Sequence, residues 1–120
     1  MLARFTQVDY DREMALVAVD GGTPEKPLRA FAGVARYTAN PDGESAEFAI
    51  VVGDAWQGSG VAGLLMLRLI DCAKRRGLSR LEGAVLRANV KMRKFCEALG
   101  FVTHDDPNEP EQVTMVLDLT

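Results

Sequence analysis

The pattern of apolar and polar positions changes character near the middle of the 120-residue chain. In the first half, short apolar runs alternate with segments rich in Gly, Pro, Asn and Asp, which is typical of strands joined by turns. The sequence therefore predicts strands at residues 13–19, 28–38 and 45–52, with turns at 20–24 and 40–43. Because the connections are short and turn-like, we expect these strands to form an antiparallel meander.

The second half of the chain carries helical spacing. Residues 60–76 present two adjacent apolar stripes and end in basic residues followed by a glycine, which predicts a helix packed in a core. Residues 90–99 repeat apolar positions at helical intervals and predict a second helix. Strands are expected at 80–87 and 112–119, with a polar loop at 103–111. The order βββαβαβ indicates a mixed α/β (α+β) fold.

Three shorter features complete this description. Residues 1–8 hold few apolar positions, chiefly Leu2 and Phe5, and predict the last turns of a helix. Gly33 lies inside the second predicted strand, where a glycine marks a bulge or a close approach. Trp56 precedes the glycine-rich segment that follows the third strand and is expected to be a packing anchor.

Composition places residues 1–120 in a single globular domain. With 48% hydrophobic and 26% charged residues, the chain can bury a core without disulfides or metal. Its net charge of −3 disfavours a general nucleic-acid binder, and we find neither a membrane-length apolar run nor a signal-peptide stretch. Cys72 and Cys96 fall on apolar helix faces, as buried free thiols of a cytoplasmic protein do, and with one histidine they make no metal site.

A glycine-rich segment at residues 57–63, with the sequence QGSGVAG, links the third strand to the first helix. Glycines let a ligand approach the backbone closely, and the first turn of a helix presents unpaired amides at the positive end of its dipole. The segment therefore predicts an anion site for a phosphate or pyrophosphate group. The alternative is a glycine-rich helix start that binds no ligand.

The stretch from Gly58 to Gly63 also spells the G-x-G-x-x-G pattern of dinucleotide-binding folds, with Glu82 near the offset of a ribose-binding acid. The context disagrees, because three antiparallel-type strands precede the motif and residues 53–57 separate it from the third strand. Glu82 also falls within a strand rather than at its end. A P-loop is excluded, because no Gly-Lys-Ser/Thr follows.

A second pattern, formed by Gln57, Gly60 and Ala62, resembles the acyl-CoA loop of the GNAT N-acetyltransferase superfamily. The preceding strand, SAEFAIVV, is similar to the central strand of that family, and the long helix follows directly. Downstream, Asn89 and the Leu-Gly-Phe run at residues 99–101 match the family's Asn … Leu-Gly-Phe ending at the usual spacing. Two separate motifs in the correct order extend the resemblance over nearly the whole chain.

The segment DYDREMA at residues 9–15, together with AEFAIVV, resembles the C-terminal acetyltransferase domain of bacterial protein lysine acetyltransferases that regulate acyl-CoA synthetases. The resemblance implies a GNAT-like, mostly antiparallel central sheet flanked by helices. The family's first strand and helix, and most of its second helix, are expected to be missing, with residues 1–8 as the end of that second helix. A homodimer partner or an upstream domain would then complete the fold.

The same resemblance implies that acetyl-CoA is the cosubstrate. The end of the central strand would pair with the pantetheine arm, the loop amides would hold the pyrophosphate, and the Asn would contact the cofactor side of the cleft. The implied cofactor-binding residues are Ile50, Val51, Val52, Gln57, Gly58, Ser59, Gly60, Val61, Ala62 and Asn89. Asn89 is also a natural N-cap of the second predicted helix. Lys91, Arg93 and Lys94 form a solvated helix face, from which one residue can meet the 3′-phosphate.

Two residues are candidates for the chemistry. Glu47 lies where lysine acetyltransferases of the superfamily place a base glutamate, and a lysine amine of pKa about 10.4 must lose a proton before it attacks. The alternative for Glu47 is an exposed edge carboxylate. Cys96 stands where many family members place a proton-donating Tyr, so core packing, a catalytic acid and a covalent nucleophile are all open to it.

The resemblance thus implies an N-acetyltransferase that moves an acetyl group from acetyl-CoA to a primary amine by direct attack, with a protein lysine as the acceptor. A small-molecule amine acetyltransferase and a non-catalytic acyl-CoA-binding regulatory module are the alternatives. Neither nucleic acid nor a membrane is expected as a partner.

Overall fold

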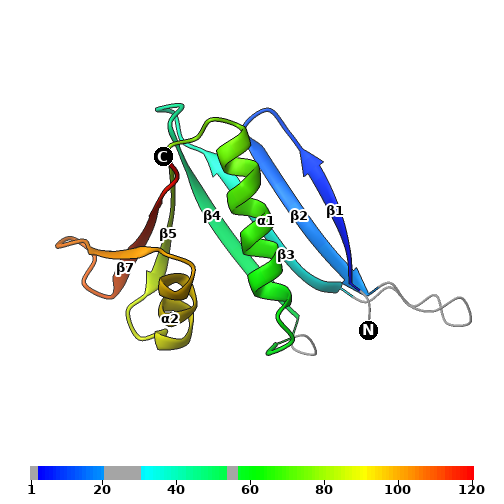
Figure 1. Cartoon of the computed structure of the whole chain (residues 1–120). Coiled ribbons are helices and arrows are strands. Elements are labelled where there is room, and N and C mark those ends of the chain that lie inside the picture. The colour runs from blue at the N-terminus through cyan, green and yellow to red at the C-terminus, as the bar shows by residue number, and fades with distance from the viewer. Residues whose placement is uncertain (1–2, 21–30, 54–56) are drawn as a thin grey trace, which may run out of the picture.

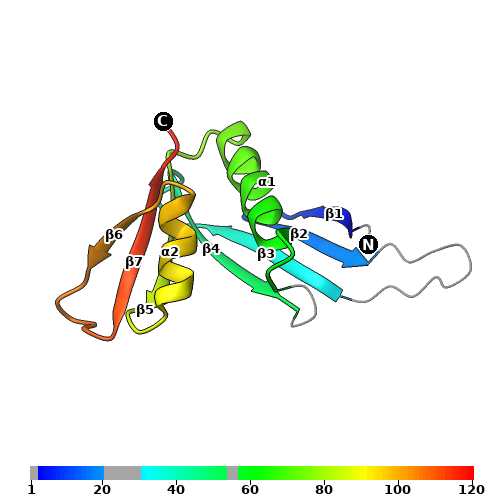
Figure 2. The same cartoon turned by 60° about the horizontal axis from the view of Figure 1, so that its bottom comes forward.

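The computed structural model describes residues 3–20, 31–53 and 57–120, which form one seven-stranded sheet with two helices on the same face (Figures 1 and 2). The strand order is β1-β2-β3-β4-β5-β7-β6. Neighbouring strands are antiparallel except β4 and β5, which run parallel. The predicted mixed α/β fold with a mostly antiparallel sheet is confirmed.

The helices predicted at 60–76 and 90–99 and the five predicted strands are present, whereas the helix end predicted at 1–8 is not. The elements are β1 (Ala3–Asp9), β2 (Glu13–Asp20), β3 (Phe31–Ala39), β4 (Ser45–Val52), α1 (Val61–Arg75), β5 (Arg80–Leu86), α2 (Val90–Ala98), β6 (Val102–Asp105) and β7 (Gln112–Asp118). Most of the predicted turn at 20–24, the predicted strand start at 28–30 and the predicted packing of Trp56 lie outside the described residues.

Two strands differ from the prediction. The sequence predicts a helix end at 1–8, but Ala3–Asp9 form β1 and pair antiparallel with β2 over their whole length. Residues of this segment alternate between the two faces of the sheet, and Phe5 reaches the α1 side, where the guanidinium of Arg68 lies 4.3 Å from its ring. The predicted polar loop at 103–111 begins inside β6 (Val102–Asp105). This segment is a strand because its backbone groups form hydrogen bonds with β7, which does not depend on apolar side chains.

The predicted turn at residues 40–43 joins β3 to β4. The Asp42 carboxylate accepts hydrogen bonds from the backbone amides of Ser45 at 2.9 Å and Glu44 at 2.8 Å, and these hydrogen bonds hold the pKa of Asp42 below its ordinary value. The turn also holds the start of β5, because the Ser79 amide donates to the Glu44 carbonyl at 2.7 Å. The first residues of β4 and β5 are thereby kept together.

Gly33 lies where β3 passes beneath α1. The pairing of β2 with β3 shifts by one residue next to Ala18, which is a β-bulge. A Cβ on Gly33 would lie 3.0 Å from Cδ1 of Leu65 and 3.0 Å from the carbonyl oxygen of Val51. The bulge and the close approach that the sequence predicts are therefore both present.

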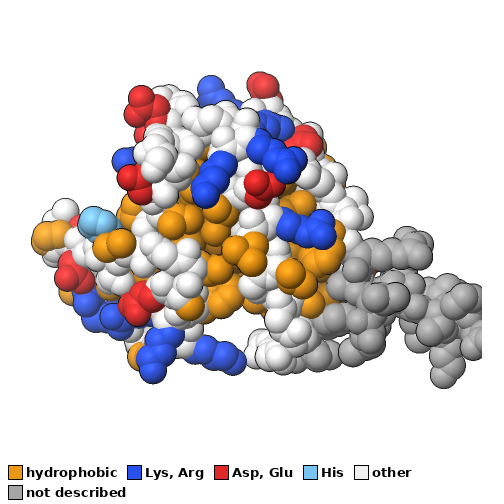
Figure 3. Space-filling model, viewed as in Figure 1, with side chains coloured by type: hydrophobic (Ala, Val, Ile, Leu, Met, Phe, Trp, Pro, Cys, Tyr) orange, Lys and Arg blue, Asp and Glu red, His pale blue; other side chains and the backbone are white. Residues whose placement is uncertain are grey.

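Helix α1 packs across β2, β3 and β4. Its buried residues are Val61, Leu65, Met66, Leu69, Ile70 and Ala73. Leu64 and Leu67, which belong to the predicted apolar stripes, are exposed. Figure 3 shows apolar side chains gathered in the middle of the helix-bearing face, with charged side chains toward its rim. Over the described ranges, the opposite face of the sheet carries no helix.

No helix in the described part of the chain is both long and apolar enough to cross a membrane.

Two adjacent leucines of α1 test this packing. Leu65 is fully buried, whereas 51% of Leu64 is exposed. We expect Leu65→Ala to lower the free energy of unfolding by about 2–5 kcal/mol, because it removes buried methyl groups and leaves a cavity. Leu64→Ala, the matched control, should change it by no more than about 0.5 kcal/mol. Urea denaturation measures both, and equal losses would contradict the described orientation of the helix.

Candidate active site

The glycine-rich segment forms a loop and the first turn of α1, as predicted. Gly58 and Gly60 have φ angles of +78° and +89°, the left-handed region that glycine adopts readily. Gly60 is the N-cap residue and supplies no side-chain cap, and the first turn of α1 holds no acidic residue. The positive end of the helix dipole therefore meets no acidic side chain within that turn, which suits an anionic ligand.

Strands β4 and β5 pair only at their starts. The residue pairs that join them are Ser45 with Arg80, Ala46 with Leu81, and Glu47 with Glu82. Beyond this point the two strands part, and residues 48–52 of β4 remain paired with β3 but not with β5. The backbone on that side of β4 is an unpaired strand edge inside the sheet, which an extended ligand can pair with.

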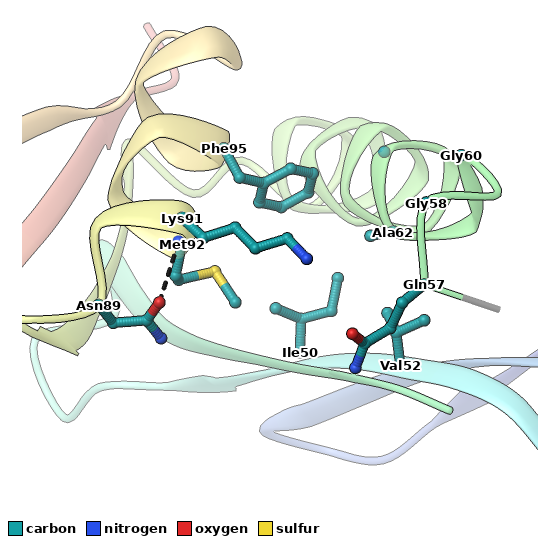
Figure 4. Close-up of a pocket in the computed structure, with 11 residues that line it drawn as sticks. Ile50, Val52, Gln57, Gly58, Gly60, Ala62, Asn89, Lys91, Met92 and Phe95 are labelled. Atoms are coloured by element: carbon teal, nitrogen blue, oxygen red, sulfur yellow. Dashed lines mark hydrogen bonds between the residues drawn. The ribbon is translucent and has the colours of Figure 1, made fainter. Parts of the chain in front are cut away.

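A cleft of about 510 Å³ lies between β4, α2 and the start of α1 (Figure 4). It brings together seven of the ten expected cofactor-binding residues: Ile50, Val52, Gln57, Gly58, Gly60, Ala62 and Asn89. The other three do not line it. Val51 points to the opposite face of β4, and Val61, the first residue of α1, is buried. Ser59 lies in the loop, with its Oγ 3.4 Å from the Val61 amide.

The cleft has four further lining residues: Gly63, Lys91, Met92 and Phe95. Met92 and Phe95 belong to the apolar stripe that predicts the second helix, and such a stripe does not distinguish a core wall from a cleft wall. Lys91 was expected on a solvated face near the cofactor, and Figure 4 shows its side chain extending from α2 across the cleft. Among the residues described as lining the cleft, Lys91 is the one cation.

Asn89 occupies both of the places expected for it. Its Oδ1 accepts a hydrogen bond from the Met92 amide at 3.2 Å and so caps the N-terminus of α2. The same side chain stands at the cleft wall opposite the glycine loop (Figure 4). The cap therefore fixes the amide group of Asn89 at the edge of the cleft.

A second cavity, of about 240 Å³, occupies the gap between β4 and β5. It shares Ile50, Asn89 and Met92 with the cleft, so the two spaces adjoin. Its remaining lining residues come from both faces of the two strands and are Phe48, Ala49, Ala84, Val85 and Leu86. The gap therefore leads from the cleft toward the face of the sheet that carries no helix in the described part of the chain.

Two carboxylates lie side by side on that face. Glu47 and Glu82 form the last pair before β4 and β5 part. Glu82 is partly buried, and its carboxylate accepts hydrogen bonds from Asn40 Nδ2 and Arg80 Nε, each at 3.3 Å. Glu47 is exposed, and its carboxylate has no hydrogen-bond or ion-pair partner within the described ranges. One carboxylate is thus held in place by hydrogen bonds, and the other is exposed to solvent.

Cys96 is completely buried in α2 and lines neither cavity. Burial raises the pKa of its thiol to about 11, so the thiol stays protonated at neutral pH. A nucleophilic cysteine needs an accessible thiolate, so this environment favours core packing over covalent catalysis. A role for Cys96 as a catalytic acid remains a prediction.

Basic side chains near α2 are partly engaged within the protein. Arg87 forms an ion pair with Asp105 at 2.7 Å, and the guanidinium of Arg93 donates to the Arg87 carbonyl at 3.0 Å. Lys91 is therefore the basic residue of this region that faces the cleft. Among the described residues, no three His, Cys, Asp or Glu side chains are grouped to hold a metal ion.

Comparison with known proteins agrees with this geometry. The family model described as "Acetyltransferase (GNAT) family" matches residues 2–101. An acetyltransferase of Pseudomonas aeruginosa is 36% identical over 116 residues, which cover 94% of this chain and 59% of the relative. The acetyltransferase Pat of Mycolicibacterium smegmatis is 32% identical over 137 residues, which cover 100% of this chain and 40% of that protein. The chain thus spans between two fifths and three fifths of these relatives' lengths.

Among solved structures, the GNAT domain of S. lividans PAT superposes with a TM-score of 0.76 at 31% sequence identity. The match covers 95% of this chain and 65% of that one. The shared architecture therefore includes the strands and helices that enclose the cleft.

The thiol of Cys96 makes the free energy of unfolding depend on pH. Its pKa in the folded protein, about 11, lies above the ordinary value of 9.0, so the folded state keeps the proton to higher pH than the unfolded chain does. This contribution to stability is complete below about pH 9 and is lost as the pH rises toward about 11. We expect the unfolding free energy to fall more steeply over that range in the unmodified protein than in Cys96→Ala. Denaturant titrations at several pH values measure this, and parallel curves would contradict it.

Proposed function

Because this chain belongs to the GNAT acetyltransferase family, as its two sequence motifs predict, we propose that it transfers an acetyl group from acetyl-CoA to a primary amine. The proposed acceptor is a lysine side chain of a protein. The observation that carries the proposal is the pair of adjoining spaces. A cleft with the glycine-rich loop at one end leads into a gap that opens near Glu47, whose carboxylate has no partner among the described residues.

The chemical groups that line the cleft support acetyl-CoA as the cosubstrate. Amides of the Gly58–Gly60 loop and of the first turn of α1, together with the Lys91 ammonium, suit the negatively charged pyrophosphate. The unpaired edge of β4 suits the two amides of the pantetheine arm, which can pair with it as an added strand. The apolar side chains of Met92 and Phe95 suit the methylene groups of the arm.

The gap is the proposed place of reaction. A thioester that extends from the cleft into the gap meets an amine that arrives from the face without helices. The Glu47 carboxylate takes a proton from the arriving ammonium ion, and the neutral amine nitrogen then bonds to the carbonyl carbon. The carbon–sulfur bond breaks, and the second proton of the nitrogen passes to solvent. CoA leaves as a thiolate, a leaving group that needs little acid assistance. A backbone amide of β4 near Val51 is the proposed hydrogen-bond donor to the carbonyl oxygen.

Glu47 is preferred to Glu82 as the base because of its surroundings. The Glu82 carboxylate already accepts hydrogen bonds from Asn40 and Arg80 and forms an ion pair with Arg80, so its oxygens are engaged within the protein. Glu47 has no such partner in the described residues and lies at the point where β4 and β5 separate. Its neighbour two residues along the strand, Ala49, lines the gap.

Charge near the gap supports a cationic acceptor. Glu13, Thr38, Glu47 and Glu82 are in register across four strands, so three carboxylates form one row on the face without helices. A lysine side chain, which approaches as an ammonium ion, gains from this negative field before it loses its proton. The same row of carboxylates would also attract small polyamines. An experiment must therefore distinguish a protein lysine from a small amine as the acceptor.

The role of Glu47 is tested by Glu47→Gln. We expect kcat to fall by about 10²–10⁴-fold, because the amide cannot accept the proton, while the affinity for acetyl-CoA stays unchanged. CoA release with polylysine as the acceptor measures turnover, and calorimetry measures binding. Glu82→Gln is the matched control, since it removes the neighbouring charge from the same pair of strands, and it should keep most of its turnover.

Three other outcomes have distinct meanings. Unchanged turnover in Glu47→Gln would show that another group accepts the proton. Turnover with spermidine but not with polylysine would replace the protein acceptor by a small amine. Binding of acetyl-CoA without turnover on either acceptor would favour a non-catalytic acyl-CoA-binding module.

The anion-binding loop is tested with a pair of glycines. Gly60 and Gly43 both have positive φ angles, +89° and +71°, and a Cβ at either position would meet nothing within 4 Å. Alanine at either site strains the backbone by about 1–2 kcal/mol. We expect Gly60→Ala to weaken acetyl-CoA binding about tenfold, because the loop amides shift. Gly43→Ala, in the β3–β4 turn, should cost stability alone. Calorimetric titration measures both affinities, with NADH as the ligand control, and equal affinities would contradict binding at this loop.

A further inference from the structure

Gly83 occupies a position where the backbone does not demand a glycine. It lies in the middle of β5, is paired with Met115 of β7, and does not have a positive φ angle. A glycine in a regular strand weakens that strand, because it adds flexibility and has no side chain to pack. A packing reason is therefore required.

The reason is the ring of Phe48. A Cβ on Gly83 would lie 2.6 Å from Cε1 of Phe48 and 2.9 Å from both Cδ1 and Cζ, distances that real Cβ atoms do not tolerate. The ring therefore occupies the space that any side chain at position 83 would fill. Phe101 packs against the same ring, with centroids 5.0 Å apart and planes at 54°, and both aromatic side chains are buried. The aromatic pair fixes the position of the Phe48 ring.

This contact stands at the point where the sheet opens. The last residue pair between β4 and β5 is Glu47 with Glu82, so Phe48 and Gly83 are the next residues along each strand. Their backbones do not pair, and the ring lies against β5 instead. Phe48 also lines the gap, where it is the lining residue of β4 nearest to the paired ends. The ring thus closes the narrow end of the gap.

We propose that Phe48, seated on Gly83, sets the length of the acyl group that the gap admits and so restricts the domain to short acyl thioesters. This inference rests on the proposed function, since it concerns the acyl end of the same ligand. Each further carbon of the acyl chain must enter a space lined mostly by apolar side chains, whose inner end is the ring of Phe48. In an apolar pocket, a single methylene changes selectivity by roughly tenfold or more.

The experiment is a calorimetric titration of the intact chain with CoA, acetyl-CoA, propionyl-CoA and butyryl-CoA. In the unmodified protein, we expect the affinity to fall with each added carbon. Phe48→Leu lacks the outer ring atoms and lengthens the gap, so it should raise the affinity for butyryl-CoA relative to acetyl-CoA by about tenfold. Free CoA, which carries no acyl group, should bind to both proteins equally.

Phe95→Leu is the matched control, because Phe95 lines the cleft but not the gap. It should change the affinity for all four ligands by the same factor. A butyryl-to-acetyl ratio in folded Phe48→Leu that stays within about twofold of the unmodified protein, well below the expected change of about tenfold, would overturn the proposal while leaving the proposed function intact. If the folded, unmodified protein binds none of the four ligands, the proposed function falls and this inference falls with it.

A second pair of variants tests the contact itself. Gly83→Ala should lower the melting temperature, because its Cβ meets the ring, and should lower the affinity for butyryl-CoA further. In the Phe48→Leu background, where Cε1 and Cζ are absent, the same alanine should cost less stability. Equal losses of melting temperature in the two backgrounds would show that Phe48 and Gly83 are not coupled and would overturn the proposal.

Discussion

The parting of β4 and β5 after Glu47 and Glu82 is the constraint on which the rest of this molecule depends. Two parallel strands that begin a ladder would ordinarily continue it, because each further pair satisfies backbone groups that are otherwise costly to leave unpaired. Here the ladder stops, and the unpaired edge, the gap and the cleft all lie in the space that results. The site is therefore made from an interruption of regular structure.

Contacts on both sides of the opening make this interruption stable. At the closed end, the Ser79 and Arg80 amides donate to the Glu44 carbonyl, and Asn40 links the β3–β4 turn to Glu82. At the open end, α1 packs on β2 to β4, while α2 lies over the other strands and is tied to β6. Each helix is thus anchored to one side of the opening.

The sequence was most informative where a pattern has one structural meaning. Helical spacing over residues 60–76 and alternation over 45–52 gave elements close to those observed, and QGSGVA gave the loop. Patterns with two meanings gave the errors. Residues 3–9 are too short and too weakly apolar to distinguish a helix end from an edge strand, and β6 is a strand by pairing with β7 rather than by its polar side chains.

The site was predictable to a similar extent, and for similar reasons. Seven expected residues line the cleft, whereas Met92 and Phe95 were not predicted as cleft residues, because a stripe at helical spacing looks the same on a core wall and on a cleft wall. The need for a glycine at position 83 could not be predicted from the sequence. The space is occupied by the ring of Phe48, which lies 35 residues earlier in the chain (83 minus 48). Contacts of that kind are set by tertiary packing and leave no local signal.

The side chains of β4 alternate between the cleft and the face of the sheet that carries Glu47. Ile50 and Val52 face the cleft, while Glu47, Ala49 and Val51 face the other side of the same strand. A ligand that pairs with the edge between these two rows has its long arm on the helix side and its reactive end near the carboxylate side. Because one strand carries both rows, the distance between the cleft-facing side chains of β4 and Glu47 is set by strand geometry. In the proposed reaction, a thioester of fixed arm length extends along that strand, and the ring of Phe48, between Glu47 and Ala49, would determine how much chain can extend beyond the carbonyl carbon.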